Sequence, residues 1–203
     1  MVRPFSIFAL IGYSTFSNFR GTDVSTRPEN WDGADLRRAI LKDANLRSVD
    51  LRSASLQEAR LGGAVLRDAD LRDADLRNAG LQGVDLRHAL LRGADLRGAR
   101  LPGADLRDSD LRVAKLHNVD LRNAKLQRAD FGQANLNEAR LIGADLRGAN
   151  FVGANFKGAD LENANLGGAD LRKSRNLTEA QLNQACGDGE VLLPPTLTIA
   201  PCN

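Results

Sequence analysis

A period of five residues runs through most of this chain. From Leu36 to Leu171 every fifth residue is Leu or Phe, 28 times in succession, and the residue two positions earlier is Ala, Val or Ser each time. A fixed short period of this length is typical of a solenoid, in which each repeat packs only against its neighbours. The sequence therefore predicts one elongated repeat body.

The period excludes both a helix and a plain strand. Apolar positions at i−2 and i, repeated every five residues, scatter around a helix of about 3.6 residues per turn and form no stripe. Strict alternation along a strand would need an even period. A unit of strand followed by a turn fits: in Ala104-Asp105-Leu106, Ala and Leu point inward and Asp outward. Arg107 and Asp108 then turn the chain, and turn positions rich in Gly, Asn, Asp and Ser suit such a corner.

These residues resemble the pentapeptide-repeat family, whose motif is A(D/N)LXX. The position before each Leu or Phe is Asp or Asn in 18 of the 28 units, and the match runs from Ala34 to about Lys173. The resemblance implies an all-β solenoid, a right-handed, four-sided parallel β-helix with four pentapeptides per turn and about seven regular coils, stacked about 4.8 Å apart. Residues twenty apart would then stack, which places Phe131 and Phe151 directly above one another and Phe156 on the next side.

Three parts are expected along the chain. Residues 1–33 would form an N-terminal cap with one or more irregular coils, residues 34–173 the β-helix, and residues 174–203 a C-terminal cap. Within the last part, a short helix is predicted over 178–186, with Thr178 as N-cap and Gly187 beyond its end, followed by an extended tail. Caps are needed because the ends of a solenoid expose unpaired strand edges.

The cysteines and the N-terminal segment each leave two alternatives open. Cys186 and Cys202 would either form a disulfide that closes the C-terminal segment or remain reduced thiols. Residues 1–13 would be either an apolar cap or a targeting signal. We expect a cytoplasmic protein, with export to a periplasm or lumen as the alternative. No apolar run approaches the ~20 residues that span a bilayer, so no membrane partner is expected.

The outward residues are dominated by arginine and aspartate. The chain has 28 basic and 26 acidic residues, and the tripeptide Asp-Leu-Arg occurs eleven times. Because Asp and Arg flank an inward Leu, both point outward, so each such Arg has an Asp nearby on its own strand. We interpret these ladders as a solvated surface of paired charges. An Arg-ladder nucleic-acid binder is the less favoured alternative.

Function is predicted from one unusual side of the coil and from the resemblance. The side that contains Leu61, Leu81, Leu101 and Leu141 is expected to be the flattest and least charged, and it is the candidate interaction surface through Gly63, Gly83, Pro102, Gly103, Ile142 and Gly143. No catalytic, cofactor-binding or metal-binding motif is present. We therefore predict a protein that is not an enzyme, with no cofactor and no small-molecule substrate.

The resemblance implies a structural or protein-interaction scaffold with an unknown protein partner, and a dimer through the C-terminal end is a further contact to consider. Some relatives protect DNA gyrase from quinolone drugs by mimicking DNA. Mimicry needs a strongly acidic rod. The formal net charge of +2 and the many arginines disfavour that alternative here.

Overall fold

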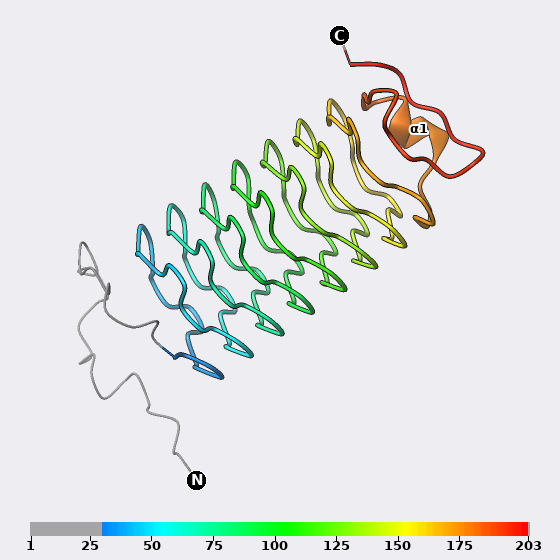
Figure 1. The fold of residues 1–203 in the computed structure, drawn as a ribbon. Coiled ribbons are helices and arrows are strands. Elements are labelled where there is room, and N and C mark those ends of the chain that lie inside the picture. Colours follow the sequence, from blue (N-terminus) through cyan, green and yellow to red (C-terminus); the bar gives the residue numbers. More distant parts are fainter. Residues whose placement is uncertain (1–29, 203) are drawn as a thin grey trace.

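The chain winds through a stack of successive coils, which form the body of the protein (Figure 1). The structure, a computed structural model, describes residues 30–202. Single parallel bridges join residues twenty apart without interruption, from Asn30 with Asp50 to Asn155 with Arg175. Each turn of the coil therefore contains four pentapeptide units, and the predicted stacking register is confirmed.

A tight turn closes every pentapeptide. The amide of each inward Ala donates to the carbonyl of the Leu three residues earlier, as from Ala104 to Leu101 at 3.1 Å. The second turn residue is left-handed throughout: every fifth residue from Gly33 to Lys173 has φ between 53° and 73°. Gly, Asn and Asp tolerate this conformation better than other residues, which explains their frequency at that position.

The interior contains the inward Ala and Leu side chains, nearly all of them fully buried. Phe131 stacks on Phe151 with ring centroids 4.9 Å apart, and Phe156 meets Phe151 edge-on at 5.1 Å, as the register predicts. Ser109 replaces one inward Ala, and its hydroxyl donates to the carbonyl of Leu106 at 2.6 Å, so this buried polar group is satisfied. The core is therefore uniform, built almost entirely from Ala and Leu side chains.

The regular ladder begins at Asn30, four residues before the expected boundary at 34. Trp31 takes the place of the inward Leu, and its amide donates to the carbonyl of Asp50 at 2.7 Å. Gly33 then adopts the left-handed turn conformation with φ of 66°. The rest of the N-terminal cap predicted over 1–33 lies outside the described residues.

The C-terminal segment continues the coil in irregular form. Cys186 bridges to Asn165 and Leu192 to Asp170, offsets of 21 and 22 residues in place of twenty. Between them, helix α1 (Glu179–Leu182) stands where the next strand over Asp160 would lie, and Gln181 Nε2 donates to the carbonyls of Phe156 and Ala159 at 2.8 Å each. The solenoid thus continues into an eighth, modified coil.

Helix α1 is shorter than the predicted helix over 178–186. Its N-cap is Thr178, as predicted, and Gln181 completes a capping box with it. The helix ends early because the carbonyl of Gln184 accepts from the amide of Asn163 at 2.7 Å and Cys186 rejoins the ladder. Among residues 30–202, no helix has the length and apolar character to cross a membrane.

A disulfide closes the tail. Cys186 is bonded to Cys202 in the structure, which corresponds to the first of the two alternatives that the sequence leaves open. The tail between them is extended in part, with a turn at Pro195 and Thr196 and a bridge from Gly187 to Pro201.

Candidate interaction surface

The outer surface consists of four columns. Each column contains the pentapeptide units that lie twenty residues apart in the sequence, and each is named by its first inward leucine: the Leu36, Leu41, Leu46 and Leu51 columns.

In all eleven Asp-Leu-Arg units the Asp carboxylate accepts from Nε and Nη2 of the Arg two residues later, at distances between 2.5 and 3.0 Å. Two-pronged pairs of this kind compensate both charges. The interpretation of the ladders as paired charges is confirmed.

These pairs hold their carboxyl groups in the ionised form. The side-chain hydrogen bond from Arg37 lowers the pKa of Asp35 to about 2, and the bond from Arg77 does the same for Asp75. In Asp120, the bond from Arg122 again lowers the pKa. The columns built from such pairs are therefore electrostatically satisfied without any partner.

The Leu41 column contains one of the eleven pairs, Asp120 with Arg122. The predicted site residues all lie on its turns. Gly63, Gly83, Gly103 and Gly143 occupy the left-handed second turn position, with φ between 62° and 71°. Pro102 and Ile142 occupy the first turn position. The twenty-residue spacing thus brings all six predicted residues onto one edge of this column.

The expectation that this is the least charged side considered the turns alone. The outward strand position of the same column also contains cations, namely Arg60, Arg100 and Arg140. Arg60 and Arg100 are separated by Gly80, which bridges to both of them. Within residues 30–202, no carboxylate oxygen lies within 4.0 Å of the guanidinium of Arg60 or of Arg100.

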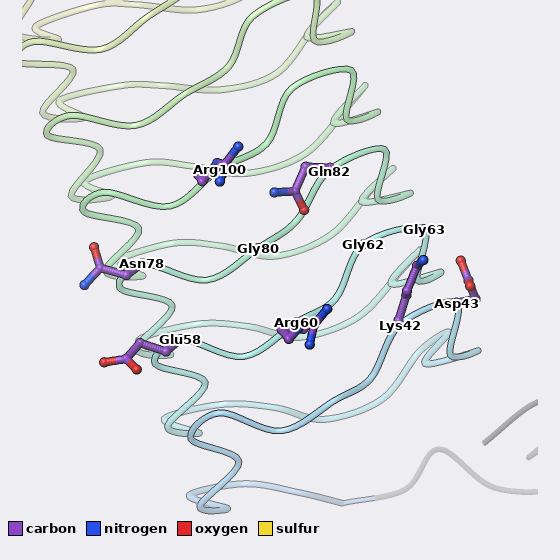
Figure 2. A pocket seen from close by; sticks show the side chains of 10 residues that line it. All are labelled: Lys42, Asp43, Glu58, Arg60, Gly62, Gly63, Asn78, Gly80, Gln82 and Arg100. Atoms are coloured by element: carbon purple, nitrogen blue, oxygen red, sulfur yellow. The ribbon is translucent and has the colours of Figure 1, made fainter. Parts of the chain in front are cut away.

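A hollow of about 590 Å³ lies over this part of the column (Figure 2). Lys42, Arg60 and Arg100 supply its cationic groups, and Gly62, Gly63 and Gly80 contribute only backbone. Of the six predicted residues, Gly63 alone lines the hollow. Sequence reasoning missed Arg60, Gly80 and Arg100, although the same twenty-residue spacing, applied to the outward strand position, would have found them.

The hollow has the chemistry of a binding surface for an anion. Its cations are exposed, and the glycines allow close approach of another chain. Among residues 30–202, no group of three or more His, Cys, Asp or Glu side chains is arranged to hold a metal ion.

The sequence matches the family of pentapeptide repeats, in eight copies, over residues 30–57, 54–93, 89–128, 114–151 and 149–186. The chain therefore belongs to the pentapeptide-repeat family, and its fold is a right-handed β-helical solenoid.

Two solved structures illustrate the likeness. HetL, a pentapeptide repeat protein involved in heterocyst differentiation regulation from the cyanobacterium Nostoc sp. strain PCC 7120, is 29% identical, with 82% of this chain and 85% of HetL covered and a TM-score of 0.51. Trypsin-treated QnrB1, a plasmid-mediated fluoroquinolone resistance protein, is 25% identical, with 79% and 77% covered and a TM-score of 0.48. No curated protein matches the sequence.

Proposed function

We propose that this protein is a non-enzymatic scaffold, a four-sided rod capped at its C-terminal end by α1 and the disulfide-bonded tail, which binds another protein through the Leu41 column. The observation that carries the proposal is the hollow at Arg60, Gly80 and Arg100, where the pairing of outward charges is interrupted. Ten of the eleven two-pronged pairs lie on the other three columns. The role of HetL in the regulation of differentiation supports a regulatory interaction.

Site-specific photo-crosslinking in the native cell tests the proposal. A photoreactive residue at Gln82, which lines the hollow, is compared with one at Gln133, an exposed turn residue of the Leu51 column. We expect a discrete crosslinked protein from position 82 and none from position 133. Crosslinks of equal yield at both positions, or at neither, would contradict the proposal.

A DNA-mimicking action on DNA gyrase is the alternative that the family suggests. It needs an acidic rod, whereas the carboxylates of the Asp-Leu-Arg units are each bound by an arginine. We expect no inhibition of supercoiling and no protection from quinolones in an assay with purified gyrase. Inhibition of supercoiling or protection from quinolones at low micromolar protein would favour DNA mimicry over the scaffold function.

The disulfide bears on the compartment. Disulfides persist in oxidising compartments and are rare in the cytosol, so the bond between Cys186 and Cys202 favours the exported, periplasmic or lumenal alternative over a cytoplasmic location. Intact mass measurement after alkylation of unfractionated cells checks this inference. We expect no alkylated cysteine without reductant and two after reduction; two alkylated cysteines without reductant would favour the cytoplasm.

A further inference from the structure

The outward residues of the Leu41 column change their pattern along the rod. From Arg100 onward, cations and carboxylates alternate at twenty-residue intervals through Asp120, Arg140 and Asp160. Nη1 of Arg140 lies 4.0 Å from Oδ2 of Asp120. Towards the N-terminal end, Gly80 stands between Arg60 and Arg100 at the position where this alternation would place a carboxylate.

We propose that this gap binds a carboxylate side chain of an acidic, extended peptide segment in the partner protein. The ligand carboxylate would lie over Gly80 between Arg60 and Arg100, in the place that Asp120 fills two coils further along the column. The inference rests on the proposed scaffold function, and it names the chemistry that the scaffold recognises.

The geometry of the column suits such a ligand. Adjacent coils are about 4.8 Å apart, so the backbones of Arg60 and Arg100 are about 10 Å apart with Gly80 midway. Two long guanidinium side chains can converge on one carboxylate across that distance, and Arg binds carboxylates with two parallel hydrogen bonds. Lys42 adds a third cation at one end of the hollow (Figure 2).

The two acidic residues that line the hollow do not cancel its charge. Oε2 of Glu58 accepts from Nε of Arg38 at 2.9 Å, so this carboxylate is already paired. Asp43 lies against Gly63, where its Oδ1 would clash with an added Cβ. Three cations therefore face one unpaired carboxylate, and the hollow as a whole is positive.

The positive region is too short for a nucleic acid to follow. Nucleic-acid binding requires a stripe of free cations that tracks successive phosphates. On the adjacent columns Arg77 is bound to Asp75 at 2.7 Å and Arg87 to Asp85 at 2.6 Å. A short acidic peptide matches the extent of the free charge.

A second hollow on the Leu46 column provides an internal contrast. It has a volume of about 470 Å³ and is also lined by three arginines. All three are bound to carboxylates, at distances of 2.6 Å for Arg107, 2.7 Å for Arg128 and 2.7 Å for Arg147. An arginine-lined hollow is thus not by itself an anion site; the free guanidinium groups distinguish the hollow over Gly80.

Fluorescence anisotropy with a labelled peptide of alternating Glu and Gly residues tests the inference at low salt. The variant Arg60→Gln/Arg100→Gln should bind the peptide about tenfold or more weakly, because both charge-assisted contacts are lost. The matched control is Arg72→Gln/Arg112→Gln, which removes the same charge at the same forty-residue spacing from the Leu51 column, where both arginines are paired. Its affinity should stay within about twofold of the wild type.

A second variant supplies the missing carboxylate within the chain. An added Cβ at Gly80 meets chiefly the flexible side chain of Gln82, at 3.3 Å, so Gly80→Asp should fold. Its carboxylate would occupy the gap between Arg60 and Arg100 and should weaken peptide binding as much as the double Arg variant. Gly80→Ser, without the charge, should retain most of the affinity.

Three outcomes would overturn the inference: no peptide binding by the wild type, equal loss in the double variant and its control, or tighter binding of an oligothymidylate of the same charge. Circular dichroism melts of each variant confirm that it is folded. If crosslinking from position 82 survives in Arg60→Gln/Arg100→Gln, the scaffold function stands and only the carboxylate site fails.

Discussion

The Leu51 and Leu41 columns are built on the same interior and differ outside. Both present fully buried inward residues, Leu91 and Leu81 among them, and both are held by the same twenty-residue bridges. The Leu51 column contains four of the Asp-Leu-Arg pairs and the Leu41 column one. Because the interior and the backbone bridges determine the fold, the outward residues are free to vary, and the two columns differ in how many of their charges are paired.

The largest effects are expected inside, where the two columns should be indistinguishable. Leu81→Ala and Leu91→Ala each leave a cavity in a tightly stacked core and should lower the free energy of unfolding by about 2–5 kcal/mol. Urea denaturation of the two variants measures the loss. A difference between them of more than about 1 kcal/mol would show that the two interiors are not equivalent.

Acid should weaken the paired columns. The pKa values of Asp35 and Asp75 are lowered to about 2, against about 3.9 for an unfolded Asp. A lowered folded-state pKa contributes stability above the unfolded pKa, and that contribution is lost as the pH falls through the folded pKa. The melting temperature should therefore be steady above pH ~4 and fall between pH ~4 and ~2.

The control for the acid transition removes two pairs of the Leu51 column. Asp70→Asn/Asp110→Asn should show a smaller decrease in melting temperature over the same pH range, because fewer bound carboxylates remain to be protonated. An unchanged pH profile would mean that these pairs contribute nothing to stability.

A smaller contrast is expected between single arginines. Arg72 is bound to Asp70, whereas Arg60 has no carboxylate partner among residues 30–202. Arg72→Gln should lower the melting temperature slightly, and Arg60→Gln should leave it unchanged. If Arg60→Gln were the more damaging change, Arg60 would be a structural residue and not a free binding group.

The period of five predicted the interior of this protein in detail, including the stack of Phe131 on Phe151, because inward packing tolerates few residue types. It did not predict that Trp31 takes the place of an inward Leu, since the pattern was defined by Leu and Phe. Thr178 identified the start of α1, but its end depends on a long-range bridge from Cys186 to Asn165 that local propensity does not contain. Arg60 and Arg100 were missed because only the turn residues of their column were considered, although the twenty-residue spacing of its outward strand position contains them.

The smallest effects are expected at the turns, where the two columns also differ. Val113, on the Leu51 column, is exposed and β-branched, yet it has φ of 53°. Left-handed backbone costs a non-glycine residue about 1–2 kcal/mol, and glycine loses about 0.5–1 kcal/mol of chain entropy on ordering, so Val113→Gly should raise stability by about 0.5–1 kcal/mol.

Gly83 of the Leu41 column has φ of 62° and no atom within 4 Å of an added Cβ, so Gly83→Ala should lower stability by about 1 kcal/mol through backbone strain alone. Denaturation curves with opposite shifts for the two variants would place the difference between the turns in the backbone. If Val113→Gly instead destabilised the protein, the Val side chain would have to contribute packing that outweighs its strain.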